Sequence, residues 1–253
     1  MTEQNHRSIA EQDLQLALPD GTADAVLFTP ESHKPLPGIL FIPDVGSVRE
    51  VKREMARRLA AEGYTVLLPN TFYRTSRPPV FHSPRIPGDP ATTKRMYELL
   101  DSLTPDRLER DLPVYLDFLA AQPITGKVGT VGFCVGGGIA LRAAAVRPDL
   151  VVATASFHGG GLYRADDPAS PHLVLPRVKA RLYFGHAVED SSMNTQAIAA
   201  LDQALTAWGG RFESETYAGA HHGWTVPDSP AYNQPQAERA YARLTAFFRE
   251  TLA

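Results

Sequence analysis

The sequence predicts an α/β protein with a mostly parallel central sheet covered by helices on both faces. Short apolar runs typical of buried strands alternate with helix-length amphipathic segments, and this alternation identifies the class. No repeat or linker interrupts it. The chain has 253 residues, of which 43% are hydrophobic and 21% charged, enough apolar material for a sizeable core. We therefore expect one domain over residues 1–253.

The strands and helices are expected in strict alternation along the chain. The predicted strands are the apolar runs at 38–42, 64–68, 127–133, 151–157, 180–184 and 212–217. One predicted helix follows a Ser47–Glu50 capping box, and a second starts at Thr104 with proline at its first helical position. Three more helices are predicted at 135–146, 198–208 and 237–248. Residues 71–105 break the alternation with a proline-rich stretch, which we expect to line a binding site.

Composition also argues against several classes of partner. A net charge of −3 gives no electrostatic reason to bind nucleic acid. The single cysteine excludes an internal disulfide and fits a reducing compartment. The N-terminal stretch is polar, unlike a secretory signal, and no apolar run approaches the roughly 18 residues of a membrane span. We expect a soluble, cytoplasmic protein without a cofactor, and no oligomeric state is indicated.

The strongest functional signal is the segment GFCVGG at residues 132–137, between a predicted buried strand and an alanine-rich helix. This strand–turn–helix context is that of the nucleophile elbow, G-x-S-x-G, of α/β-hydrolases. Small flanking residues such as Gly132 and Gly136 let strand and helix approach closely. Here the nucleophile would be the thiol of Cys134, favoured as a thiolate by the helix N-terminus. The alternative is that Cys134 is only a small buried apolar residue.

An elbow of this kind predicts an acid and then a histidine later in the chain. Glu189 and Asp190 follow the predicted strand 180–184, where such folds place site residues. His221 and His222 follow the last predicted strand, in the position expected of the base. Position in the chain alone does not show which residue of each pair is the acid or the base. A metal site built on the two histidines has no third ligand at recognisable spacing, so no metal is expected.

At these residues the chain resembles the dienelactone hydrolase (carboxymethylenebutenolidase) family, over roughly residues 20–251. The family also has cysteine in its elbow. The segment GAHHGW at 219–224 resembles the family's G-A-x-H-G-F turn, which implies His222 as the base. The acid loop likewise implies Asp190. The run Phe72-Tyr73-Arg74 resembles the segment whose arginine binds the substrate carboxylate, which implies Arg74 as a substrate-binding residue.

Two departures from the family pattern concern the substrate. Members that open dienelactone carry a glutamate after the first core strand, thought to accept the cysteine proton, and Asp44 stands at that position. They also carry a second arginine shortly after the histidine, where this chain has Thr225-Val226-Pro227. We therefore expect the family's chemistry to hold while the substrate differs. Asp44 could be a proton acceptor or simply a turn residue.

The expected function is hydrolysis of an ester or lactone of a small molecule through a cysteine acyl-enzyme. Cys134 attacks the carbonyl, His222 moves the proton and Asp190 orients it. The backbone N–H groups of Val135 and Val45 would hold the oxyanion. A general carboxylesterase or thioesterase would use the same residues. A protein of another class, a non-catalytic binder or thiol sensor, would keep the fold without turnover.

Overall fold

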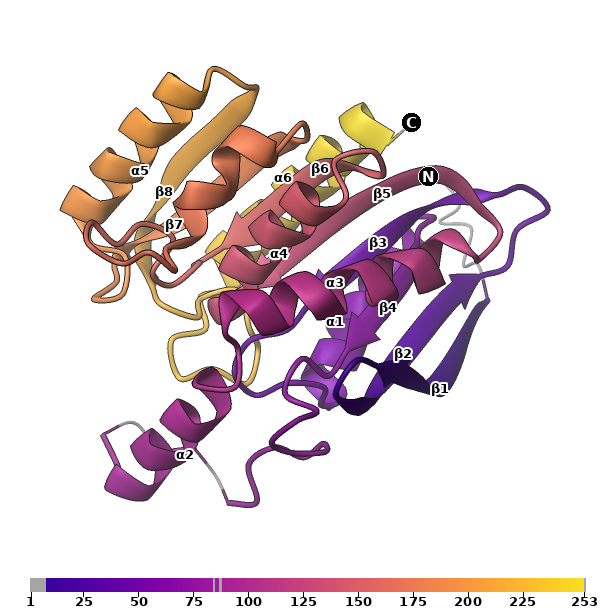
Figure 1. Ribbon diagram of the computed structural model, residues 1–253, viewed down its shortest axis with the longest axis horizontal. Helices are drawn as coiled ribbons and strands as arrows, with labels where there is room; N and C mark the ends of the chain where they lie inside the picture. The colour runs from indigo at the N-terminus through magenta and orange to yellow at the C-terminus, as the bar shows by residue number, and fades with distance from the viewer. Residues whose placement is uncertain (1–7, 84, 87, 253) are drawn as a thin grey trace.

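The computed structural model describes residues 8–83, 85–86 and 88–252, and it contains one eight-stranded sheet of order β1-β2-β4-β3-β5-β6-β7-β8 (Figure 1). The strands from β3 and β4 to β8 pair in parallel, whereas β1 and β2 join the edge antiparallel. This mostly parallel sheet confirms the predicted fold class. The strands are β1 Ile9–Leu18, β2 Gly21–Pro30, β3 Leu36–Ile42, β4 Thr65–Pro69, β5 Ile124–Phe133, β6 Val151–Phe157, β7 Arg181–Glu189 and β8 Phe212–His221.

Helices cover both faces of the sheet (Figure 1). On one face α1 and α6 pack with residues such as Leu59 and Leu244 in one apolar cluster, and on the other α3, α4 and α5 contribute Leu112, Ala144 and Leu201 to a second cluster. Burial on both faces explains the continuous apolar runs of the central strands. The helices are α1 Glu50–Ala61, α2 Pro90–Leu100, α3 Pro105–Ala120, α4 Val135–Val146, α5 Thr195–Trp208 and α6 Gln234–Leu252, with a short 3₁₀ helix at Pro171–Arg177.

The structure contains a hairpin and a helix that were not predicted. The N-terminal hairpin β1–β2 was not predicted, because its first strand is half exposed and polar. Part of the proline-rich stretch is helical: α2 begins after Asp89, whose carboxylate caps the N–H of Thr92. Residues 1–7, Pro84 and Pro87, which belong to the predicted polar N-terminus and excursion, lie outside the described residues.

The predicted capping box at the start of α1 is wrong. The residue before α1 is Arg49, which makes no side-chain cap, and Ser47 instead bonds Asn70 at 2.8 Å. Ser47 also has a φ of 54°, so the chain turns sharply between β3 and α1. The N-cap at Thr104 is as predicted, since its hydroxyl accepts the N–H of Arg107. Of the described part of the chain, no helix has both the length and the apolar character to cross a bilayer.

Candidate active site

Cys134 lies in the turn between β5 and α4 and has a φ of 57°, in the left-handed region that side chains other than glycine rarely adopt. The turn is possible because the residues two positions before and two positions after Cys134 are glycines. A Cβ on Gly132 would overlap the carbonyl of Gly136, and one on Gly136 would lie 2.6 Å from the carbonyl oxygen of Pro43. Strand and helix therefore meet at this turn, which holds the thiol at the carboxyl end of the sheet. A strained residue at this place is typical of a nucleophile elbow.

His222 and Asp190 lie side by side, at the ends of β8 and β7. His222 Nδ1 is 2.6 Å from Asp190 Oδ2, and the Asp190 side chain is only 2% exposed. Ser192 completes the arrangement by donating its N–H and its hydroxyl to Asp190 Oδ1, at 2.9 and 2.6 Å. Burial alone would raise the pKa of Asp190, but the hydrogen bonds of His222 and Ser192 lower it below its ordinary value. Asp190 is therefore a carboxylate that orients the histidine.

The surroundings of His222 favour its charged form. Burial alone would lower the pKa of His222, but its hydrogen bonds to Asp190 and to the sulfur of Cys134, with their charges, raise it to about 10. At neutral pH the imidazole is thus stabilised as a cation between a carboxylate and a sulfur. The structure brings together the three residues that the resemblance implied. This arrangement can support nucleophilic attack by a thiolate.

The neighbouring pair, His221 and Glu189, lies outside this arrangement. His221 Nδ1 is 3.4 Å from Glu189 Oε2, and the two side chains are 57% and 74% exposed. Alternation along β7 and β8 explains the separation, because consecutive side chains in a strand point to opposite faces. Within the described residues no group of three or more histidine, cysteine and acidic side chains is arranged to hold a metal ion.

A buried histidine, His158, contacts the backbone of Cys134. Its Nδ1 accepts the N–H of Cys134 at 3.1 Å, and its Nε2 is 2.8 Å from the hydroxyl of Thr225. Its ring packs edge-to-face against His222, with centroids 5.1 Å apart. Burial, and then the positive charges of His222 and Lys52, hold the pKa of His158 well below its ordinary value. His158 therefore remains neutral and serves as an acceptor for the nucleophile's backbone.

Two backbone N–H groups near Cys134, those of Val45 and Val135, have no hydrogen-bond partner among the described residues. Val45, after β3, lines the cavity that contains Cys134, and Val135 follows Cys134 at the start of α4. The side chain of Val45 belongs to a small apolar cluster, and the side chain of Val135 packs against this cluster. This packing brings the two turns together.

Asp44 lies beside this turn as a permanently charged carboxylate. Arg49 binds both of its oxygens, at 2.7 and 3.0 Å, and the Nζ of Lys52 lies 3.1 Å away. Burial alone would raise the pKa of Asp44, but these two cations lower it far below its ordinary range. An acid so stabilised is a poor proton acceptor, and the geometry favours its role in the turn, where it also accepts the N–H of Gly46.

Arg74 does not lie where the resemblance placed it. It is absent from the described lining of the cavity around Cys134 and instead binds Asp111 through two nitrogens, at 2.5 and 2.8 Å, and Asp20 at 2.8 Å. The side chains of Arg74 and Asp111 are only 10% and 4% exposed. A guanidinium held by two carboxylates is not free to bind a substrate anion. The arginine that lines the cavity is Arg85, which was not singled out from the sequence.

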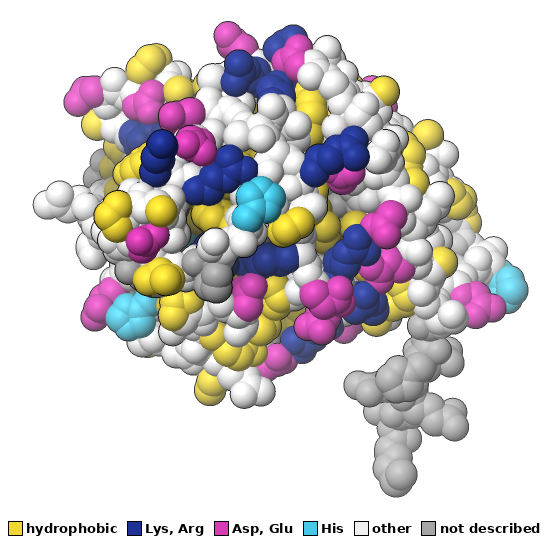
Figure 2. Space-filling view, turned by 90° about the horizontal axis from the view of Figure 1, so that it is seen from below, with side chains coloured by type: hydrophobic (Ala, Val, Ile, Leu, Met, Phe, Trp, Pro, Cys, Tyr) yellow, Lys and Arg dark blue, Asp and Glu magenta, His cyan; other side chains and the backbone are white. Residues whose placement is uncertain are grey.

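The cavity around Cys134 measures about 500 Å³, within the usual range of small-molecule sites. One wall carries Cys134, His158 and His222, and the opposite wall carries residues of the 71–105 segment: Phe81, Arg85, Thr92 and Met96. Figure 2 views the molecule from this side; basic and acidic side chains are interspersed there, with hydrophobic side chains exposed between them.

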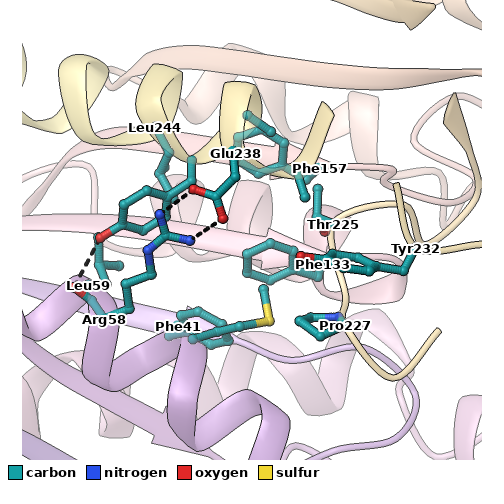
Figure 3. Close-up of a pocket in the computed structure, with 14 residues that line it drawn as sticks. Phe41, Arg58, Leu59, Phe133, Phe157, Thr225, Pro227, Tyr232, Glu238 and Leu244 are labelled. Atoms are coloured by element: carbon teal, nitrogen blue, oxygen red, sulfur yellow. Dashed lines mark hydrogen bonds and ion pairs between the residues drawn. The ribbon is translucent and has the colours of Figure 1, made fainter. Parts of the chain in front are cut away.

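A second cavity lies behind the loop that follows β8 (Figure 3). Its lining is mainly apolar, with Phe41, Phe133 and Leu244, and the ion pair of Arg58 with Glu238 lies at its side. Its volume is about 70 Å³ and it does not include Cys134, so it is too small and wrongly placed to hold a substrate for the thiol.

Ser192, Thr225 and Arg49 were not identified from the sequence as residues of the site. Ser192 could have been found, because a serine two residues after an aspartate often closes a turn onto its carboxylate. Thr225 and Arg49 act through partners distant in the chain, which spacing cannot reveal.

Comparisons with known proteins show the family to which the chain belongs. The model of the dienelactone hydrolase family matches residues 23–252. A carboxymethylenebutenolidase of Rhodococcus opacus is 29% identical, over 85% of this chain and 81% of its own, and a "Putative carboxymethylenebutenolidase" of Synechocystis is 26% identical over 97% and 96%.

A solved structure from Klebsiella pneumoniae, described as a "Putative Dienelactone Hydrolase", superposes with a TM-score of 0.85 at 22% identity, covering 96% of this chain and 99% of its own. The likeness in structure shows an α/β-hydrolase-type fold. Because the family model spans nearly the whole chain, the protein belongs to the dienelactone hydrolase family.

Proposed function

We propose that this protein hydrolyses a carboxylic ester or lactone of a small molecule through a covalent thioester on Cys134. The observation that carries the proposal is that His222, bound to Asp190 at 2.6 Å, lines the same cavity as Cys134 and that His158 contacts both Cys134 and His222. A buried carboxylate, an imidazole and a nucleophile in this order are the arrangement of a hydrolytic triad. Membership of the family supports the same chemistry.

In the first half of the reaction the Cys134 thiolate attacks the carbonyl carbon. The C–O bond to the leaving alcohol breaks, and the alcohol takes a proton from the imidazolium of His222. In the second half His222, now neutral, takes a proton from water, whose oxygen attacks the thioester carbon. The C–S bond breaks, the acid leaves and the thiolate–imidazolium pair is restored. Asp190 holds Nδ1 throughout, so Nε2 performs both transfers.

The negative charge that develops on the carbonyl oxygen would be held by the N–H groups of Val135 and Val45. Both are free of partners among the described residues, and both belong to turns that adjoin the thiol. Preorganised donors of this kind are commonly worth about 3–4 kcal/mol each in the transition state. The thiol proton passes to His222 rather than to Asp44, because Arg49 and Lys52 hold the pKa of Asp44 too low.

The substrate group nearest the cavity mouth would meet Arg85. This guanidinium lines the cavity, is exposed and makes no ion pair with any residue in the described ranges. We assign to it the contact with a substrate carboxylate that Arg74 cannot make. Because Arg85 is the one lysine or arginine among the described residues that line the cavity, neutral esters should compete with acidic substrates.

The test is turnover of a chromogenic aryl ester by the wild type, by Cys134→Ala and by wild type alkylated at its only thiol. The proposal expects both treatments to abolish turnover while the circular dichroism spectrum is unchanged, because alanine fits the turn. Undiminished hydrolysis by Cys134→Ala would overturn it. Labelling of Cys134 in a protein that turns over no ester would favour the thiol sensor, and a panel of lactones, aryl esters and thioesters separates the hydrolase alternatives.

A further inference from the structure

A guanidinium connects the two loops that carry the oxyanion donor and the base. Arg49, just before α1, binds both carboxylate oxygens of Asp44, at 2.7 and 3.0 Å, and both of Asp228, at 2.7 and 2.8 Å. Asp44 directly precedes Val45, and Asp228 lies in the loop that follows His222. We call this the Arg49 bridge: Asp44, Arg49 and Asp228, with Lys52 on the outer oxygen of Asp44.

The bridge leaves Arg49 no capacity to bind anything else. All three guanidinium nitrogens donate to the two carboxylates, and one of them also reaches the carbonyl of Ser47. A planar group with donors on two sides suits such paired recognition, and lysine cannot reproduce it. Burial alone would lower the pKa of Arg49, yet Asp228 and Asp44 raise it above its ordinary value, so the bridge is charged at every relevant pH.

The turn around Val45 is built to accept this guanidinium. A Cβ on Gly46 would lie 2.6 Å from one nitrogen of Arg49, so the glycine leaves room for it. The N–H of Gly46 donates to Asp44 at 2.8 Å, which fixes the carboxylate against its own backbone. Lys52, fully buried, lies 3.1 Å from the same carboxylate and 4.6 Å from the ring centroid of Phe133, the residue before the nucleophile. The orientation of the Val45 peptide therefore follows from the position of Asp44.

We infer that Arg49 is a positioning residue for the oxyanion hole, which holds the N–H of Val45 in place by tying Asp44 to the loop of His222. The inference rests on the proposed function, because it assigns the Val45 N–H to the oxyanion. Its physical basis is that donors stabilise a transition state only when held in place, and a shift of about 1 Å can cost roughly 100-fold in rate. Arg49 touches no reacting atom and acts through Asp44.

The experiment compares two reactions of the same thiol. Ester hydrolysis needs both the thiolate and the oxyanion hole, whereas alkylation of Cys134 by iodoacetamide needs only the thiolate. For Arg49→Met we expect kcat for an aryl ester to fall roughly 10- to 100-fold with KM little changed, and the alkylation rate to stay within about twofold of wild type. Arg49→Lys should recover part of kcat. Arg53→Met, on the same helix but paired with Glu11 and Asp13 at the surface, is the matched control and should leave both rates unchanged.

A milder variant covers the case in which Arg49→Met does not fold. Asp228→Asn breaks only the more exposed half of the bridge, since this side chain is 41% exposed, and should lower kcat about tenfold or less without slowing alkylation. Equal losses in hydrolysis and alkylation would overturn the inference, because Arg49 would then act on the thiolate. Unchanged kcat in both variants would also overturn it. Failure of the proposed function is distinct, since wild type would then lack turnover or Cys134→Ala would retain it.

Discussion

The two walls of the catalytic cavity are built in different ways. The side at the carboxyl ends of β5 to β8 is held by hydrogen bonds: the buried Asp190 is bound by His222 and Ser192, and the buried His158 by Cys134 and Thr225. The opposite wall comes from the 71–105 segment, whose helix α2 extends from the body of the molecule (Figure 1). Its one buried hydrophobic side chain among the described α2 residues is Leu99.

This difference separates chemistry from specificity. On the sheet side Asp190 and His158 are held by burial and hydrogen bonds, so their protonation and position follow from the fold. On the other side Arg85 is exposed, and Phe81 and Met96 are partly buried against a small apolar cluster that is separate from the two main clusters on the sheet. Such a segment can alter the substrate while the reaction is retained. The predictions below test each wall in turn.

The largest effect is expected on the sheet side. His222→Ala and Asp190→Asn should each lower kcat for an aryl ester by roughly 10³- to 10⁴-fold, because either change breaks the proton path to Cys134. The matched controls are the adjacent, exposed His221→Ala and Glu189→Gln, which should change kcat by less than about twofold. Steady-state kinetics give kcat for all four variants. A similar loss of kcat in the two histidine variants, or in the two acid variants, would refute the assignment.

Arg74→Ala should lower the free energy of unfolding and leave the preference between acidic and neutral esters unchanged. The substitution leaves Asp111 almost buried without its guanidinium partner, and breaking a buried pair costs about 3 kcal/mol or more. Arg110→Ala is the matched control, because Arg110 binds Asp20 at the surface and should cost less than about 1 kcal/mol. Urea unfolding gives both values. A change in preference between acidic and neutral esters for Arg74→Ala, with stability intact, would restore Arg74 to the site.

Arg85→Ala should change selectivity and spare stability. Loss of one exposed, charge-assisted contact should raise KM for carboxylate-bearing lactones about tenfold, near the lower end of the range for such bonds, while KM for neutral aryl esters stays the same. Arg77→Ala, an exposed arginine of the same segment outside the cavity lining, is the control. If both substrate types are affected alike, Arg85 does not read the substrate's charge.

The smallest effect concerns pH. Because the pKa of His222 is raised to about 10, its stabilising contribution is fully present below its unfolded pKa of about 6.5 and is lost as pH rises toward 10. Asp190→Asn removes one source of that shift, so its free energy of unfolding should decline less than that of wild type between pH 7 and 10. The difference should be on the order of 1 kcal/mol, since His222 is about one-third exposed. An identical decline would show that Asp190 does not stabilise the imidazolium.

The same contrast explains what could be predicted from the sequence. The core strands are continuous apolar runs, and the glycine pattern around Cys134 lies between a strand and a helix, so local patterns identify both the fold class and the turn. The α2 helix was missed because prolines dominate the segment before it. Arg74 was misplaced because a motif carries no information about Asp111, 37 residues away, which binds it. The partners of Arg49 are likewise distant, and only the folded chain brings them together.

The central claim is a covalent acyl group on Cys134, and mass spectrometry of an acid-quenched reaction tests it most directly. Wild type mixed with an aryl acetate and quenched during turnover should carry an added acetyl group on the peptide containing Cys134, released by hydroxylamine as a thioester is. Cys134→Ala should show neither the adduct nor turnover. Turnover by Cys134→Ala at the wild-type rate, or an acyl group on another residue during wild-type turnover, would contradict the account.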